Sequence, residues 1–196
     1  MLTINLAEWY RKREEAYRRF IEDIEVGYTD RDIVDFIRLV FTKRRIFTTS
    51  SCSGRITVVD ALYPWLRDEA YILFKKHSGV ELSEIENTIS RRPLYRYWLI
   101  VSGPIIHFNI ASLEDVQKLL TVLRESGFKH SGVISISSSG IVVEAVSGVW
   151  TPFLLRDGDR ITVNNLSHIV SIANAILAEG KNRLERLFKA FKELEI

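Results

Sequence analysis

One short run of the chain gathers the residue types best suited to holding a ligand: Phe47-Thr48-Thr49-Ser50-Ser51-Cys52-Ser53-Gly54-Arg55-Ile56. Six consecutive small residues, Thr49 to Gly54, lie between apolar flanks, and the chain's one cysteine is among them. The serines supply hydroxyl and N–H groups with little bulk, and Gly54 allows the backbone to approach a bound group closely. The composition of the run favours a ligand-binding turn.

Charge and flanking segments support that interpretation. Four cations belong to the run or come just before it: Lys43, Arg44, Arg45 and Arg55. No acid lies between residues 43 and 59, so the ligand is expected to be anionic or to bear a carboxylate. Strand-like segments 46–48 and 56–59 bracket the small residues, which predicts a tight strand–turn–strand element.

Two residues could take part directly in a reaction. Along the predicted strand 105–110 the apolar residues alternate onto one face, which leaves His107 with Asn109 on the other, more polar face. Histidine titrates near neutrality and can accept a proton during a reaction, although a structural, hydrogen-bonded histidine is equally compatible with the pattern. Cys52 beside cations could act as a thiolate nucleophile, but a role in shaping the pocket is favoured.

A second acid-free stretch, residues 91–113, combines cations with aromatic rings. Its members are Arg91, Tyr95, Arg92, Arg96, Tyr97 and Trp98. Rings of this kind stack on nucleobases and arginines contact phosphates, so an RNA-binding surface is predicted. The alternative to RNA binding is that the arginines are solvated surface charges and that Trp98 is an aromatic residue of the core. Glu144 interrupts an apolar strand and is either an acid in a cleft or a residue at an exposed edge. For Ser131-Gly132 a tight turn is the first interpretation and a ligand contact the second.

Four motifs resemble, in order, those of the tRNA wybutosine-synthesizing protein 3 family. They are Phe47-Thr48-Thr49 with Ser50-Ser51-Cys52-Ser53-Gly54-Arg55-Ile56, Pro104-Ile105-Ile106-His107-Phe108, Gly127-Phe128-Lys129-His130-Ser131-Gly132, and Thr151-Pro152-Phe153. The resemblance runs from about Tyr28 onward, and no functional role carries over to residues 57–95.

The resemblance implies an S-adenosylmethionine-dependent tRNA methyltransferase. Its substrate would be 4-demethylwyosine, or the 7-aminocarboxypropyl derivative, at position 37 beside the anticodon of phenylalanine tRNA, methylated at ring nitrogen N-4. By resemblance His107 lies close to the chemistry, and it is expected to be the catalytic residue. The cofactor or substrate would contact Ser50, Ser51, Cys52, Ser53, Gly54, Arg55, Trp98, Ser131 and Gly132, and RNA would contact Lys43, Arg44, Arg45, Arg91, Arg92 and Arg96. No obligate protein partner is expected. The rival hypotheses are a non-catalytic RNA-binding module and a thiol-dependent enzyme centred on Cys52.

Composition narrows the class of protein. With 196 residues, 46% hydrophobic and 27% charged, the sequence predicts one compact soluble domain, 1–196. A single cysteine fits a reducing compartment, and neither a signal segment nor a membrane-spanning run is seen, so a cytoplasmic protein is expected. The histidines are scattered and offer no metal-ligand spacing, so no metal is expected.

The expected elements point to a mixed α/β (α+β) fold of two similar α/β halves. Helices are predicted within 6–42, at 81–90 and 112–126, and from 165 to 195 with a break or bend at Gly180. Strands are predicted at 71–74, 97–101 and 105–110 around a Gly103-Pro104 turn, at 133–136 and 141–146 as a hairpin, and at 151–155 and 161–163. No two glycines are separated by a single residue, so the nucleotide-binding glycine loop is missing. A mixed or largely antiparallel sheet is expected, not a Rossmann fold.

Overall fold

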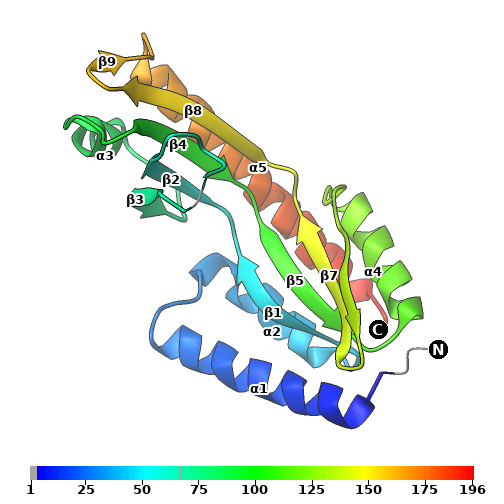
Figure 1. Cartoon of the computed structure of the whole chain (residues 1–196). Coiled ribbons are helices and arrows are strands. Elements are labelled where there is room, and N and C mark those ends of the chain that lie inside the picture. Colours follow the sequence, from blue (N-terminus) through cyan, green and yellow to red (C-terminus); the bar gives the residue numbers. More distant parts are fainter. Residues whose placement is uncertain (1–3, 67) are drawn as a thin grey trace. The chain divides into compact units, whose positions relative to one another are not determined.

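The computed structural model describes residues 4–66 and 68–196, which contain five α-helices and nine strands (Figure 1). These elements fall into two compact units. The first unit comprises Met1–Ser53, Pro104–Gly148 and Asn182–Ile196, and the second comprises Gly54–Gly103 and Val149–Lys181. The chain therefore passes between the units four times. Folding as one domain stays a prediction.

The first unit is built on a four-stranded antiparallel sheet in the order β1-β5-β7-β6. Its strands are β1 (Ile46–Cys52), β5 (Ile105–Ile110), β6 (Gly132–Ser137) and β7 (Gly140–Val146). Its helices are α1 (Leu6–Glu25), α2 (Val34–Thr42), α4 (Leu113–Glu125) and the final part, from Asn182, of α5 (Leu166–Glu193). A 3₁₀ turn, η1 (Arg31–Ile33), precedes α2. In Figure 1, α1 runs beside β1 and α4 beside β7.

The apolar side chains of β5 explain how one face of this sheet is covered. Ile106, Phe108 and Ile110 have no exposed surface, as their alternation in the sequence predicts. The ring of Phe108 stacks on Phe191 of α5 at 5.9 Å and meets Phe36 of α2 edge-on at 6.3 Å. Aromatic rings therefore fill the core between the sheet and these two helices.

The opposite face of the sheet is partly covered by α1. The buried ring of Trp9 packs edge-on against Phe47 of β1 at 5.2 Å. Its indole nitrogen donates to Asn109 Oδ1 at 2.8 Å, so the polar residue on this face of β5 is paired inside the fold. Asn5 caps the start of α1 by accepting from the backbone N–H of Glu8.

The second unit contains a five-stranded antiparallel sheet in the order β3-β2-β4-β8-β9. Its strands are β2 (Arg55–Asp60), β3 (Tyr71–Lys76), β4 (Arg96–Ser102), β8 (Trp150–Asp157) and β9 (Arg160–Ile161). Helix α3 (Leu82–Ile89), whose capping box joins Glu81 and Glu84, and α5 up to Lys181 pack on it. The core is formed mainly by aliphatic side chains, among them Ile56, Val58, Ile85, Leu99, Val101, Leu155 and Ala173.

Most predicted elements are confirmed. The fold is mixed α/β with antiparallel sheets, and residues 132–146 form the expected hairpin. Helix α4 begins after the predicted cap Ser112, whose hydroxyl accepts from the backbone N–H of Asp115. No helix in the described ranges is both long and apolar enough to cross a membrane.

The strands predicted at 46–48, 56–59, 97–101 and 105–110 are present, but the strands that follow one another across each of the two turns do not pair. β1 pairs with β5 in one sheet, whereas β2 pairs with β3 and β4 in the other. Each short connection, at 53–54 and at 103–104, carries the chain from one sheet to the other. The small residues at the two connections indicated a reversal of chain direction. The strands instead pair with strands elsewhere in the sequence, because those pairings bury their apolar faces.

Two helix boundaries also differ from the prediction. Thr29 with Asp32 has the spacing of a capping box, which predicts a helix start there, but η1 begins after Asp30 and α2 only at Val34. Helix α5 continues through Gly180 without a break. A glycine inside a helix costs only about 1 kcal/mol, which tertiary packing offsets, and Gly180 is buried.

Candidate active site

A row of three polar side chains crosses the sheet of the first unit. Ser50 on β1, His107 on β5 and Glu144 on β7 occupy directly paired positions on adjacent strands. Ser50 Oγ lies 2.9 Å from His107 Nδ1, and His107 Nε2 lies 3.0 Å from Glu144 Oε1. The side chains of His107 and Glu144 are 29% and 34% exposed, so the row is open to a bound molecule.

A β-bulge places Ser50 in this row. The register of β1 against β5 shifts between Thr48, which pairs with Phe108, and Ser50, which pairs with His107. Thr49 is thus an extra residue, and its hydroxyl lies 3.5 Å from the carbonyl oxygen of His107. Without the bulge, Thr49 would face His107 and Ser50 would pair with the buried Ile106.

The hydrogen bonds of the row determine what it can do chemically. When Glu144 accepts the Nε2–H of neutral His107, Nδ1 carries the lone pair and accepts the Ser50 hydroxyl. His107 can then take a proton directly or through Ser50, and the Glu144 carboxylate stabilises the imidazolium that forms. The same contacts could activate Ser50 as a nucleophile.

A cavity of about 270 Å³ lies beside β1, the edge strand of this sheet. Its wall on β1 is Thr48, Thr49, Ser50 and Ser51. The remaining wall comes from α1, from the segment before α2 and from α2 itself: Ala16, Arg19, Phe20, Asp23, Tyr28, Thr29, Asp30 and Ile37. Ser50 therefore belongs both to the cavity and to the row with His107.

The cavity presents charges of both signs together with hydroxyl groups. Arg19 is the cation, and its Nε lies 3.9 Å from the carboxylate of Asp23. Asp30 is the second acid in the wall. Such a set suits a small zwitterion, because carboxylate binds to guanidinium and hydroxyl groups while ammonium binds to carboxylates.

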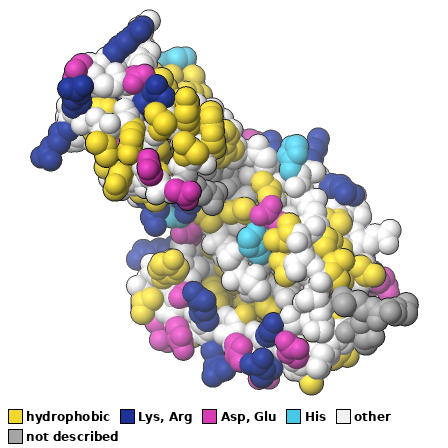
Figure 2. Space-filling view, in the orientation of Figure 1, with side chains coloured by type: hydrophobic (Ala, Val, Ile, Leu, Met, Phe, Trp, Pro, Cys, Tyr) yellow, Lys and Arg dark blue, Asp and Glu magenta, His cyan; other side chains and the backbone are white. Residues whose placement is uncertain are grey.

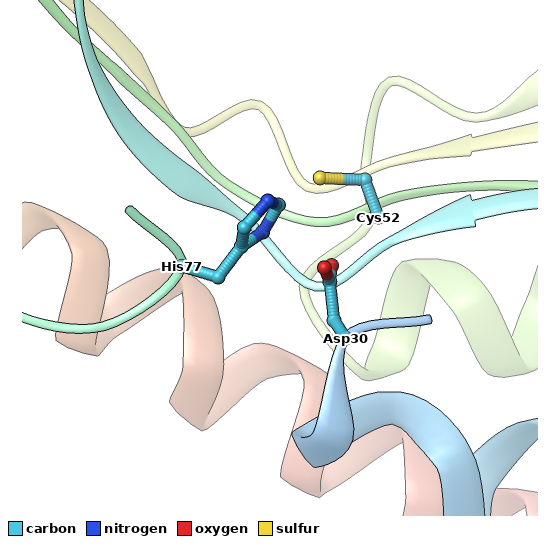
Figure 3. Close-up of side chains that lie close together, drawn as sticks. All are labelled: Asp30, Cys52 and His77. Carbon is cyan, nitrogen blue, oxygen red and sulfur yellow. The ribbon is translucent and has the colours of Figure 1, made fainter. Parts of the chain in front are cut away.

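The Asp30 carboxylate fixes the end of β1. Asp30 Oδ2 accepts from the backbone N–H of Ser53 at 2.9 Å and from its hydroxyl at 3.0 Å. Ser53 is fully buried, so its hydroxyl serves this contact. Figure 3 shows the Asp30 side chain directed toward the end of β1 where Cys52 lies, and a carboxylate oxygen lies within 4.8 Å of the Cys52 sulfur.

Gly54 and Arg55 belong to the second unit, where Gly54 has a structural reason to be glycine. Its φ is +99°, and a Cβ there would lie 2.9 Å from the carbonyl oxygen of Ser102. The carbonyl of Gly54 also lies 3.1 Å from Nδ1 of His77, the third residue labelled in Figure 3. Close backbone packing therefore explains the glycine without a ligand.

Three other predicted contact residues also have partners inside the protein. Trp98 on β4 is half-buried and donates from Nε1 to the carbonyl of Ala61 at 3.2 Å. Ser131 Oγ donates to the carbonyl of Phe128 at 2.8 Å and accepts from the N–H of Val146 at 3.1 Å, which closes the turn before β6. Gly132 pairs with Glu144 across β6 and β7, next to the polar row.

The predicted RNA-binding cations fall into two groups, one in each unit. In the first unit Lys43 donates to the carbonyls of Lys192 and Leu194, and Arg45 is 3.1 Å from the buried carboxylate of Asp115. The exposed Arg44 lies between them in sequence. Lys43 and Arg45 thus support the fold, and only their remaining exposed surface is available to a phosphate.

The second group of cations lies at the start of β4. The exposed Arg92 is 3.5 Å from Asp159, and Arg96 is 3.1 Å from Asp157, which raises the pKa of Arg96. Arg91 is exposed. Tyr97, expected as a stacking ring, is only 4% exposed and lies in the core, so that expectation is wrong for this residue. Burial raises the pKa of its hydroxyl.

Sequence reasoning missed the acidic and basic residues of the cavity. No role was predicted from the sequence for Arg19, Asp23 or Asp30. No local pattern marks them, because the cavity depends on how α1 packs beside β1. Glu144 was left open between a cleft acid and an edge residue, and the register of β5 against β7 places it beside His107.

Comparison with known proteins gives consistent matches over nearly the whole chain. The family model described as "Methyltransferase TYW3" matches residues 11–193. A protein of Saccharolobus solfataricus named tRNA(Phe) 7-((3-amino-3-carboxypropyl)-4-demethylwyosine(37)-N(4))-methyltransferase is 38% identical over 182 residues, which cover 91% of this chain and 87% of the relative. A relative of the same name from Aeropyrum pernix is 35% identical, over 89% of this chain and 94% of its own. The solved structure of the PH1069 protein from Pyrococcus horikoshii matches with a TM-score of 0.89 and 32% identity, over 97% of this chain and 98% of that one.

Proposed function

The chain belongs to the methyltransferase TYW3 family, and we propose that it methylates ring nitrogen N-4 of 4-demethylwyosine, or of its 7-aminocarboxypropyl derivative, at position 37 of phenylalanine tRNA. The methyl donor in this proposal is S-adenosylmethionine. The observation that supports it within the molecule is Ser50, which lines the cavity and also contacts the proton acceptor His107. A single site can therefore hold a reactant and remove its proton.

The cavity fits the chemical group that both reactants offer. The methionine arm of S-adenosylmethionine and the side chain of the aminocarboxypropyl derivative each end in an ammonium and a carboxylate. In the proposed arrangement the carboxylate contacts Arg19 and the hydroxyls of β1, and the ammonium contacts Asp23 and Asp30. The volume of about 270 Å³ suits an amino-acid-sized group, with the rest of the ligand outside.

In the proposed reaction, residues of the protein accept the proton that N-4 releases. When bound, S-adenosylmethionine supplies an electrophilic methyl group on its sulfonium. N-4 loses a proton as its bond to the methyl carbon forms, and the electron pair of the broken carbon–sulfur bond stays on sulfur. The Ser50 hydroxyl passes that proton to Nδ1 of His107, while Glu144 holds the ring and stabilises its positive charge. Alignment of the two reactants supplies much of the remaining acceleration.

Arg19→Ala tests which reactant uses the cavity. The change removes the cation of the wall from an exposed position on α1, so folding should be unaffected. If the donor occupies the cavity, the dissociation constant for S-adenosylmethionine should rise about 10- to 150-fold by calorimetry, since a charge-assisted contact contributes about 1.5–3 kcal/mol. If the substrate side chain occupies it, donor binding stays constant, and KM rises only for tRNA that carries the aminocarboxypropyl group.

Arg18→Ala is the matched control, because Arg18 is an exposed cation of the same helix outside the cavity wall. It should change neither constant. The cavity proposal fails if Arg19→Ala behaves like Arg18→Ala with the donor and with both tRNA substrates.

Salt dependence tests the predicted RNA contacts at the start of β4. Arg91→Ala with Arg92→Ala removes two exposed cations that we propose contact phosphates. The slope of log affinity for tRNA against log salt should become shallower by about 1 to 2, because fewer counterions are released on binding. Filter binding over a range of salt concentrations measures it. An unchanged slope would place the phosphate contacts elsewhere.

A further inference from the structure

The second unit carries a stacked pair of exposed aromatic rings that no part of the proposed chemistry uses. Tyr63 and Trp65 follow β2, with ring centroids 5.0 Å apart and planes inclined by only 7°. Tyr63 is 40% exposed and Trp65 is 66% exposed. The guanidinium of Arg96 on β4 lies over the Tyr63 ring, 5.5 Å from its centroid. Three flat groups with polarisable faces are thus gathered at the surface.

The ring pair is held in place by hydrogen bonds to β4. Arg96 Nη1 donates to the carbonyl of Leu62 at 2.9 Å, and the backbone N–H of Ala61 donates to the carbonyl of Arg96 at 3.0 Å. The N–H of Leu66 closes the loop onto the carbonyl of Tyr63 at 3.1 Å. Large rings held in this way expose apolar surface that the fold itself does not need.

The surroundings of the rings combine apolar surface with cations. Figure 2 shows hydrophobic side chains gathered over β2, β3 and β4, and the exposed ones include Leu62, Leu66, Tyr71, Ile72 and Leu73. Arg91 and Arg92 are exposed on the segment that leads into β4. Among the acids of this region, Asp157 pairs with Arg96, Asp159 pairs with Arg92, and Glu69 accepts from the hydroxyl of Tyr95, while Asp68 is exposed.

We propose that Tyr63 and Trp65 form a stacking platform for an unpaired base of the tRNA substrate, distinct from the base that is methylated. Every nucleobase offers a flat face, and the parallel rings leave the exposed face of the pair ready to extend the stack. Arg91 and Arg92 lie on the same unit and can contact the phosphates that flank such a base. The platform rests on the proposed function in one respect, namely that the ligand is tRNA.

The test measures tRNA affinity for three variants. Trp65→Ala should weaken binding of an unmodified phenylalanine tRNA transcript about 5- to 150-fold, the range expected for losing one stacked base. Trp65→Phe keeps a flat ring and should retain most of the affinity. Trp150→Ala removes a tryptophan of similar exposure, 51%, at the start of β8 and should have no effect. Circular dichroism of each variant establishes that it is folded.

Salt dependence separates stacking from charge. Because a tryptophan carries no charge, Trp65→Ala should lower the affinity at every salt concentration without changing the slope, unlike the change at Arg91 and Arg92. A folded Trp65→Ala protein with wild-type affinity overturns the platform, even if the wild-type protein methylates tRNA as proposed. A variant that changes the sedimentation mass of the free protein and leaves tRNA affinity intact assigns the rings to self-association, which also overturns it. Failure of the wild-type protein to bind tRNA would instead contradict the proposed function.

Discussion

Replacing His107 with alanine is expected to slow methyl transfer by about 10²- to 10⁴-fold, the usual contribution of a general base. The imidazole is the proposed proton acceptor of the row, because Ser50 Oγ lies 2.9 Å from its Nδ1 and Glu144 Oε1 lies 3.0 Å from its Nε2. Affinity for donor and tRNA should change little, because the cavity wall does not include His107. Single-turnover methylation of precursor tRNA measures the effect.

Two further variants make the result specific. Glu144→Gln retains a hydrogen-bonding group but removes the charge that stabilises the imidazolium, so a smaller loss of rate is expected. Cys52→Ser keeps nearly the same volume and should leave substantial methyl transfer. Higher pH should partly restore the rate of methyl transfer by the His107→Ala variant, because a base in the solvent can then accept the proton. A fully active His107→Ala enzyme would make this histidine structural. A folded Cys52→Ser enzyme that binds both substrates and is inactive would revive the covalent mechanism.

Phe108→Ala is expected to lower the free energy of unfolding by about 3–5 kcal/mol. Phe108 has no exposed surface, and its ring contacts both Phe36 and Phe191, so truncation leaves a cavity between the sheet and two helices. Urea denaturation followed by circular dichroism measures the change.

Leu113→Ala is the control for this stability prediction. Leu113 is 68% exposed at the start of α4, and its truncation should change stability by no more than about 0.5 kcal/mol. Equal effects of the two substitutions would mean that the core of the first unit is not centred on Phe108. The sheet that carries His107 would then have another source of rigidity.

Periodic patterns predicted most elements but not their pairing. The alternation of Ile106, Phe108 and Ile110 correctly placed His107 on the opposite face, because side-chain direction in a strand depends only on position in the sequence. Which strand lies beside β5 depends on long-range packing. Small residues at 53–54 and 103–104 therefore suggested hairpins where the chain instead passes from one sheet to the other.

The candidate site, like the fold, could be predicted only in part from the sequence. The run from Ser50 to Arg55 stood out by composition, yet the structure divides it between the two units after Ser53. Ser50 meets His107 only because of a bulge at Thr49, and Glu144 joins them only through the register of β7. A bulge has no reliable local signature, so this row of residues could not be read from the sequence.

We propose that methyl transfer to N-4 takes place at the site around Ser50 and His107. In the most direct measurement, purified protein is incubated with methyl-labelled S-adenosylmethionine and phenylalanine tRNA that carries the 4-demethylwyosine precursor. The modified nucleoside is then identified by mass spectrometry. We predict that the wild-type protein adds one methyl group to the tRNA, located at N-4. This product should be lost in the His107→Ala variant. Saturable binding of both reactants with no methyl group transferred would contradict the claim and favour a non-catalytic RNA-binding module.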